Sequence, residues 1–313
     1  MIELELVSAT IVGAALCFVL GANNIATCLG TTMSSQAVEY KQVVLLAAAG
    51  LMGGTIIEGG KLSHAVTGGV TPTAGPEIFL AAALSSFLIM VVLTVLSLPI
   101  SVTQVFVGAI VGAAIARATP IDFNFTGLVV VSWLMTPLAG IAAAALISFT
   151  TRAIAQRVRR VIMLNKAYTW LTIAGGFYSA YVLGANGVGL VAGASNASPA
   201  VQPWIALIFG AAAIIGMVIF GRGTTRSVAE NIVGLNMPAA MAAQVGSAAV
   251  VHGFTQVGMP VSISQAVVGG IFGAAVPRKI VVRNSRLVRE LLLGWTASPL
   301  IGAALAFILA SLL

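Results

Sequence analysis

Long apolar runs alternate with short polar stretches along most of the chain. Ten of these runs approach the roughly 20 residues that a helix needs to cross the hydrocarbon core of a membrane. They cover residues 7–30, 42–60, 77–98, 101–117, 127–150, 168–193, 203–221, 238–257, 261–276 and 291–313. The pattern predicts an all-α polytopic membrane protein. Glycine and polar residues interrupt the first and sixth runs, so we expect those two helices to be broken.

Composition supports this prediction and excludes a soluble protein. Of the 313 residues, 59% are hydrophobic and only 7% are charged, whereas soluble domains carry about 25% charged residues. The sequence also contains neither a His-Glu-x-x-His nor a Gly-x-Ser-x-Gly motif, which argues against an intramembrane enzyme. We therefore expect no enzymatic activity, no bound metal and no resident cofactor.

Basic residues gather at two places between apolar runs. The formal net charge is +7, and most of the Lys and Arg residues lie in the segments 152–166 and 278–289. This placement is typical of cytoplasmic loops rather than of a nucleic-acid surface. We expect a multi-pass protein of the cytoplasmic (inner) membrane, with both basic segments inside and the N-terminus outside.

Three sequence motifs recur in the same order, about 162 residues further along the chain. This duplication predicts a first repeat over residues 1–160 and a second over residues 161–313. Each half holds five apolar runs, an odd number, so the second half would start on the opposite side of the membrane. Inverted repeats with broken helices are typical of secondary transporters, whose substrate site lies near the middle of the membrane where the halves meet.

The first duplicated motif places amide side chains and glycines inside apolar runs. A buried amide is costly without a partner, and glycine lets the backbone approach a ligand or unwind. Hydrogen bonding between helices is the alternative explanation, but the duplication favours a transport site. The residues are Gly21, Asn23 and Asn24 in the first half, and Gly184, Asn186 and Gly187 in the second.

The second duplicated motif combines hydroxyl and amide side chains with a preceding proline, which is typical of a helix start. Free N–H groups and the helix dipole at such a start favour an anion, although ordinary N-capping is the alternative. The side chains are Ser101, Thr103 and Gln104, and Ser262, Ser264 and Gln265. The glycines that follow, Gly108, Gly112, Gly269 and Gly273, have the spacing of close helix packing.

These motifs resemble the inorganic phosphate transporter (PiT) family of secondary anion transporters, which includes phosphate carriers and sulfate permeases. The family's GAND signature is matched by residues 21–24 and 184–187, and its Pro-x-Ser-x-Thr-His segment by Pro99 to Gly112 and Pro260 to Gly273. The resemblance covers nearly the whole chain. It implies alternating access, symport with Na⁺ or H⁺, and a homodimer.

The chain departs from the family pattern at four positions. Asn24 and Gly187 replace the usual Asp, and Gln104 and Gln265 replace the His that is often present. Protonated phosphate benefits from an acceptor, whereas sulfate needs only donors and is repelled by a carboxylate. The departures therefore favour sulfate as the substrate, with phosphate or another oxyanion as alternatives. A passive anion channel is the alternative to a secondary transporter.

Two acidic residues lie in or beside the apolar runs, Glu58 and Glu230. Carboxylates within a membrane are rare and are usually functional, so both are candidates for coupling to a co-transported H⁺ or Na⁺. Each also has a basic residue one helical turn away, Lys61 and Arg226 respectively. A structural ion pair is the alternative explanation for each.

Overall fold

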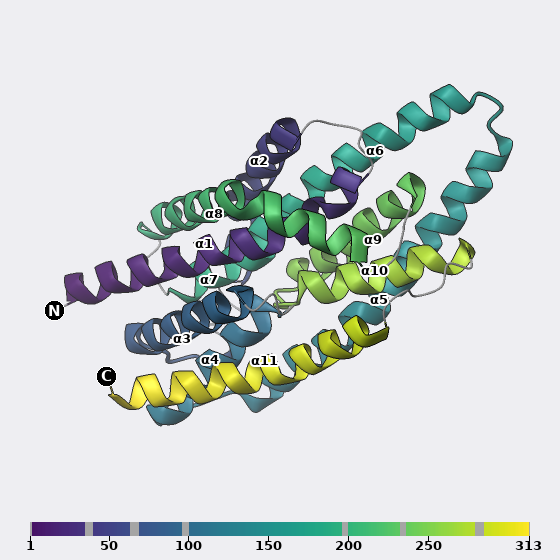
Figure 1. Ribbon diagram of the computed structural model, residues 1–313. Coiled ribbons are helices and arrows are strands. Elements are labelled where there is room, and N and C mark those ends of the chain that lie inside the picture. Colours follow the sequence, from purple (N-terminus) through teal and green to yellow (C-terminus); the bar gives the residue numbers. More distant parts are fainter. Residues whose placement is uncertain are drawn as a thin grey trace.

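The computed structural model describes the backbone of residues 2–34, 40–62, 69–95, 100–195, 200–231, 236–278 and 285–312 (Figure 1). This part of the chain is almost entirely helical and contains no strand, so the prediction of an all-α membrane protein is confirmed. Pro99, residues 279–284, and the side chains of residues 278–288, Arg226 and Glu230 lie outside the described residues.

The α-helices follow one another with short connections. In chain order they are α1 (Ile2–Ser34), α2 (Tyr40–Glu58), α3 (Pro76–Val95), α4 (Val102–Ala116), α5 (Phe123–Arg157), α6 (Val161–Val182), α7 (Gly189–Ala194), α8 (Gln202–Asn231), α9 (Met237–Gln256), α10 (Ile263–Ala275) and α11 (Ser285–Leu312). The 3-10 helices η1 (Gly59–Leu62) and η4 (Val276–Arg278) follow α2 and α10, and the π-helix η3 (Leu183–Val188) joins α6 to α7.

Seven helical segments in the described chain are long and apolar enough to cross a membrane, compared with the ten runs expected. Two of the runs form only α4 and α10, with 15 and 13 residues. At 1.5 Å per residue they are about 20 Å long, too short for a hydrocarbon core of about 30 Å. The helix α9 has 20 residues but is less apolar, because it carries Gln244, Ser247 and His252.

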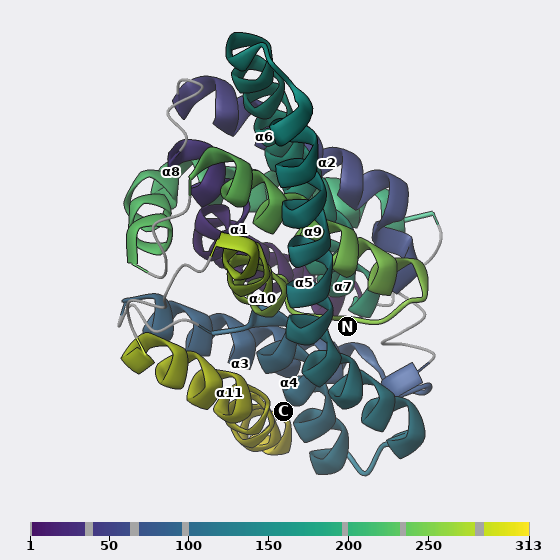
Figure 2. The same ribbon diagram turned by 90° about the vertical axis from the view of Figure 1, so that its right-hand side faces the viewer.

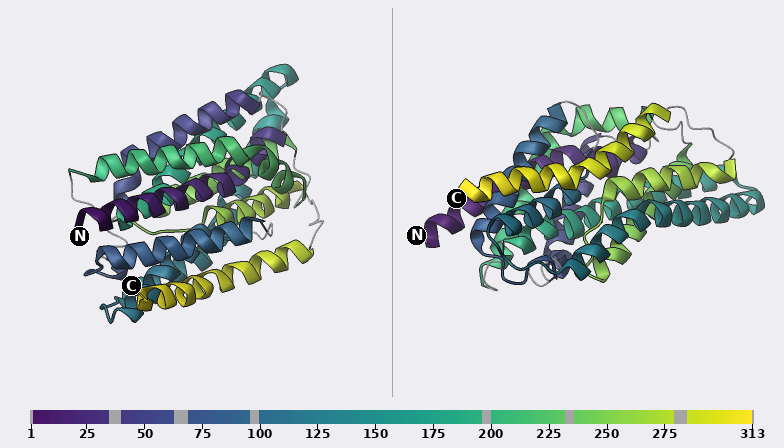
Figure 3. Two further views of the ribbon diagram at one scale, coloured as in Figure 1. Left: turned by 60° about the vertical axis from the view of Figure 1, so that its left-hand side comes forward. Right: turned by 90° about the horizontal axis from the view of Figure 1, so that it is seen from below.

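The short helices belong to two hairpins that lie toward opposite ends of the molecule. α3 packs against α4, and α9 packs against α10. Figures 1 and 3 show the first hairpin toward the end that holds both chain termini and the second toward the other end. The first turns of α4 and α10 both lie near the middle of the molecule.

The helix contacts of the two halves correspond. α1 packs along α8, and α2 packs along α6 and η3. In the same way α4 packs along α11, and α10 packs along α5. Glycines permit the last two contacts: a Cβ atom on Gly108 would lie 2.2 Å from the carbonyl oxygen of Pro299, and one on Gly269 would lie 2.1 Å from that of Pro137.

The expected basic loop 152–166 is mostly helical. α5 continues to Arg157 and α6 begins at Val161, so only residues 158–160 connect them. This connection lies at the opposite end of the molecule from the two termini, and Figure 2 is viewed from its side. The end of α10 and the start of α11 lie at the same end as this connection.

Candidate functional site

Each half of the chain contains a hydrogen bond between a motif asparagine and a threonine just before a hairpin turn. Asn23 on α1 donates from Nδ2 to Thr94 Oγ1 on α3 at 3.1 Å. Asn186 in η3 donates from Nδ2 to Thr255 Oγ1 on α9 at 3.0 Å. The two Asn–Thr pairs occupy corresponding positions in the two halves, and each ties a motif helix to a hairpin.

The π-helix η3 contains the second GAN motif and interrupts the sixth apolar run, as expected. π-Helical turns occur frequently at functional sites because they locally widen the helix. Gly184 permits this turn to approach α2, since a Cβ atom there would lie 1.9 Å from the carbonyl oxygen of Leu51. Asn186 and Gly187 are both buried within the turn.

The first GAN motif differs, because α1 is continuous from Ile2 to Ser34 and the expected break in the first run is wrong. Gly21 provides close packing rather than an unwound turn: a Cβ atom there would lie 1.9 Å from the carbonyl oxygen of Ala213 on α8. Asn24 is buried and donates to the carbonyl of Leu20 on its own helix at 3.1 Å. Only Asn23 of this motif bonds to another helix through its side chain.

The serines of the second motif are the N-caps of α4 and α10. Ser101 Oγ accepts from the backbone N–H of Gln104 at 3.3 Å, and Ser262 Oγ accepts from that of Gln265 at 3.3 Å. Capping, the alternative explanation, therefore accounts for part of this motif. Ser264 Oγ lies 2.9 Å from Ser262 Oγ.

The amide oxygens of three motif residues are buried and have no hydrogen-bond partner in the described structure. They are Gln104 Oε1, Asn186 Oδ1 and Gln265 Oε1. A buried polar atom without a partner costs about 1–3 kcal/mol, so each requires an explanation. The first turns of α4 and α10 also carry backbone N–H groups without an intrahelical partner, so each hairpin holds both acceptors and donors that suit a small polar ligand or ion.

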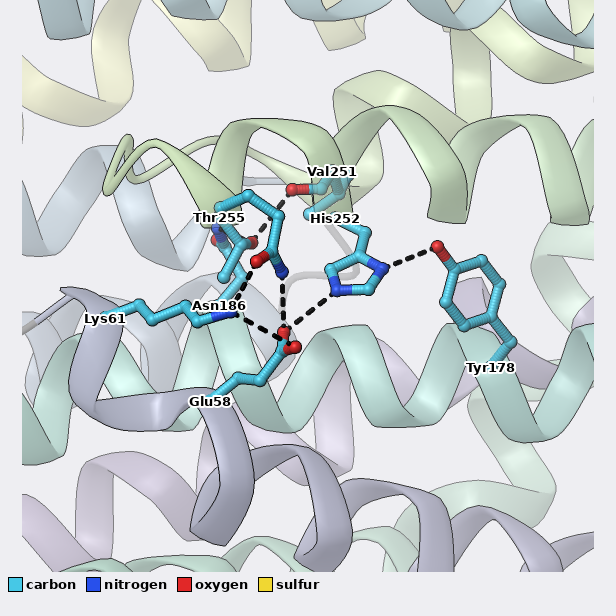
Figure 4. A network of polar contacts seen from close by, with 8 residues as sticks. Glu58, Lys61, Tyr178, Asn186, Val251, His252 and Thr255 are labelled. Atoms are coloured by element: carbon cyan, nitrogen blue, oxygen red, sulfur yellow. Dashed lines mark hydrogen bonds and ion pairs between the residues drawn. The ribbon is translucent and has the colours of Figure 1, made fainter.

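A polar network surrounds Glu58, the last residue of α2 (Figure 4). The predicted ion pair with Lys61 is formed, with 3.3 Å between Nζ and Oε1. Glu58 Oε2 also lies 2.9 Å from His252 Nε2 and accepts from Gln256 Nε2 at 2.9 Å. Tyr178 OH lies 2.7 Å from His252 Nδ1. We call these five residues the Glu58 network.

Sequence reasoning missed several of these residues. Thr94 and Thr255 are separated by nearly the same interval as the duplicated motifs, so a comparison of the two halves could have found them. The contact of Glu58 with His252 joins residues 194 positions apart and has no local signal. Gln244 donates to the carbonyl of Cys28 and thereby ties α9 to α1.

The chain matches the model of the phosphate transporter family over residues 20–306. It is 26% identical over 314 residues to a protein of Methanocaldococcus jannaschii named "putative phosphate permease", with 98% of each chain covered. It is 26% identical over 303 residues to the sulfate permease CysP of Bacillus subtilis, covering 94% of this chain and 84% of that protein. A solved structure titled as the sodium-dependent phosphate transporter shares the fold, with a TM-score of 0.83, 18% identity and 98% of both chains covered.

Proposed function

Because this chain belongs to the phosphate transporter family, we propose that it moves an inorganic tetrahedral oxyanion across the cytoplasmic membrane by alternating access. The observation that carries this proposal is the pair of corresponding Asn–Thr contacts beside the first turns of α4 and α10. Helix starts supply N–H donors and positive dipole ends without a permanent charge, which suits an anion that must be released again. Asn23, Asn186, Ser101, Thr103, Ser262 and the glutamines would line this site.

The transport mechanism that we propose rests on two inverted repeats, residues 1–160 and 161–313. The corresponding helix contacts and the opposed hairpins support this division. Each hairpin enters and leaves at one end of the molecule, so in the first half only α1, α2 and α5 run from one end to the other. Because three such helices are an odd number, the second half starts at the opposite end from the first. A site between opposed hairpin turns can be opened to either side by moving one half against the other.

We favour sulfate as the substrate. The motifs contain no carboxylate, because Asn24 and Gly187 stand where the family pattern has Asp. They contain no imidazole, because Gln104 and Gln265 stand where it often has His. Sulfate is fully ionised near neutral pH and is best bound by neutral donors. The likeness to a sulfate permease over most of the chain agrees with this choice.

Phosphate is the second candidate, and one structural observation favours it. The unpartnered oxygens of Gln104, Gln265 and Asn186 are acceptors, and a protonated phosphate carries the O–H donors that such oxygens need. The likeness to a phosphate permease extends over 98% of the chain. The amide side chains therefore fit either anion, depending on which end of each amide faces the ligand.

We propose that transport is a symport driven by Na⁺ or H⁺. The solved relative is titled as sodium-dependent, and Glu58 is a carboxylate at the end of α2 that accepts from Gln256, the residue after Thr255 on α9. Glu230 stays a second candidate for coupling, and its side chain lies outside the described residues. A passive channel is the alternative, and accumulation against a gradient separates the two because a channel cannot accumulate its substrate.

The test is uptake of labelled sulfate and labelled phosphate by the purified protein in liposomes under Na⁺ and H⁺ gradients. We expect accumulation, with unlabelled sulfate competing better than phosphate. We also expect Asn24→Asp to bring the competition by phosphate closer to that by sulfate, because a carboxylate accepts a hydrogen bond from protonated phosphate and repels sulfate. Better competition by phosphate in the unchanged protein would reject the sulfate assignment, and no uptake of either anion would reject the function.

A further inference from the structure

The Glu58 network joins α2 and η1 to the last turns of α9, the helix that carries Thr255 (Figure 4). His252 links Glu58 to Tyr178. Its imidazole faces Glu58 of α2 and two rings of α6. The ring centroids of Tyr178 and Tyr181 lie 5.5 and 6.0 Å from the centroid of the imidazole. Lys61 faces Glu58 rather than His252.

His252 has no ionisable equivalent on the first hairpin. The interval that separates Thr94 from Thr255 places Val91 of α3 at the position of His252. The first hairpin is therefore built without a histidine or a carboxylate at this place. Because an ionisable side chain within a membrane protein is costly, a histidine on one hairpin only indicates a function other than maintenance of the fold.

His252 can take up a proton without losing a hydrogen bond. The Glu58 carboxylate only accepts, so Nε2 carries a hydrogen and donates to Oε2 over 2.9 Å. In the neutral ring Nδ1 is an acceptor, and the Tyr178 hydroxyl donates to it over 2.7 Å. When a proton from water binds at Nδ1, this nitrogen becomes the donor and the Tyr178 oxygen becomes the acceptor. Both protonation states are thus accommodated by the same side-chain positions.

The network is also close to the proposed anion site. His252 precedes Thr255 by three residues on α9, and Thr255 Oγ1 accepts from Asn186 while donating to the carbonyl of Val251 at 2.8 Å. With neutral His252, the charges of Glu58 and Lys61 compensate each other. Protonation adds one positive charge next to the helix turn that holds Asn186, where it attracts an anion.

We propose that His252 is a proton-binding positioning residue of the transport site. Held by Glu58 at Nε2 and by Tyr178 at Nδ1, it binds a proton together with the anion and raises the affinity for that anion. By linkage, the bound anion raises the proton affinity of His252 by the same factor. This inference rests on the proposed function, since it assigns the regulation of the same site.

The test measures equilibrium binding of labelled sulfate and of labelled phosphate to the purified protein between pH 5.5 and 8. Sulfate keeps its charge over this range, so its binding reports on the protein alone. For each variant, binding at pH 6 is divided by binding at pH 8, which cancels any general loss of affinity. We expect a ratio of at least about 5 for the unchanged protein, because the positive charge that His252 gains with a proton attracts the anion.

The variants separate protonation from packing. His252→Gln, which keeps hydrogen bonding but cannot be protonated, should reduce the ratio to about 1. Tyr178→Phe removes the acceptor for Nδ1–H, so the midpoint of the pH dependence of sulfate binding should move to lower pH. This variant keeps the test decisive if His252→Gln does not fold. Val91→Ala, at the equivalent position of the first hairpin, is the matched control and should keep the ratio of the unchanged protein.

A second measurement follows protons directly. Addition of sulfate to weakly buffered protein should cause proton uptake, seen with a pH-sensitive dye, and His252→Gln should abolish it. Binding that does not depend on pH in the unchanged protein, or a ratio that His252→Gln leaves unaltered, overturns the inference while the proposed function stands. Absence of binding and of uptake for both anions at every pH rejects the proposed function itself.

Discussion

At the scale of single residues, the two Asn–Thr pairs define the candidate transport site. Thr255 Oγ1 accepts from Asn186 and donates to the carbonyl of Val251, so both hydrogen-bonding roles of this hydroxyl are used. Asn186 is completely buried, and its Oδ1 has no partner in the described structure. The threonine therefore fixes the direction of the amide and leaves its oxygen available to a ligand.

Thr255→Val should weaken anion transport. The change removes the acceptor of a buried N–H group while nearly keeping the volume of the side chain, at a cost of about 1–3 kcal/mol. We expect about 10-fold lower affinity for the transported anion, measured as the concentration that gives half-maximal uptake. Thr255→Ser, which keeps the hydroxyl, should retain most of the affinity.

Thr296→Val on α11 is the control for this prediction. Its hydroxyl is exposed and bonds only to backbone carbonyls of its own helix, at 3.2 and 3.0 Å. Uptake should stay unchanged. Equal affinities for Thr255→Val and the unchanged protein would show that Asn186 does not contribute to binding through this contact.

At the scale of helices, the two hairpins are held by close contacts with α5 and α11, the long helices that contain proline. Gly269 on α10 meets Pro137, and Gly108 on α4 meets Pro299, at corresponding positions. Proline within a helix leaves a backbone carbonyl without its usual partner, and the glycine lets a neighbouring helix approach that region closely. These contacts position the first turns of α4 and α10, where the second motif lies.

Gly269→Ala should destabilise the protein. The added Cβ would lie 2.1 Å from a backbone oxygen, which cannot move as a flexible side chain could. Overpacking of this kind costs about 1–3 kcal/mol, so we expect a lower midpoint of thermal unfolding in detergent. Gly127→Ala on α5 is the control, because nothing lies within 4 Å of its added Cβ. An unchanged midpoint for Gly269→Ala would contradict the close packing of α10 on α5.

At the scale of the whole molecule, both termini lie at one end and the α5–α6 connection at the other. Arg157, Arg159 and Arg160 lie at this second end. Short basic segments are retained on the cytoplasmic side of membranes. We therefore propose that this end faces the cytoplasm and that the termini face outward, while a homodimer stays an expectation from the family resemblance.

Cysteine labelling tests this orientation. Arg159→Cys should react with an impermeant maleimide only after the cells are opened, whereas Thr73→Cys, in the connection before α3, should react in intact cells. Both positions are exposed. The native Cys17 and Cys28 are 0% and 1% exposed, so background labelling should be low. Labelling in the reverse pattern would invert the proposed topology.

Much of this protein could be predicted from the sequence because the information is local or repeated. Apolar runs predicted a helical membrane protein, and the motifs around Asn23 and Asn186 indicated the family. The same motifs indicated the candidate site, which stays a prediction. The ion pair of Glu58 with Lys61 followed from their spacing on one helical turn. These features depend on neighbouring residues or on comparison of the two halves.

Only the tertiary structure decided which motif residues meet a partner and which do not. Asn23 bonds to Thr94 across 71 positions and Glu58 bonds to His252 across 194, whereas Asn24 turns to its own helix. It also decided that Gly21 serves packing in a continuous α1 while Gly184 lies in a π-helix. The physical reason is that hydropathy and capping act between near neighbours, whereas the approach of distant helices depends on how their whole surfaces pack.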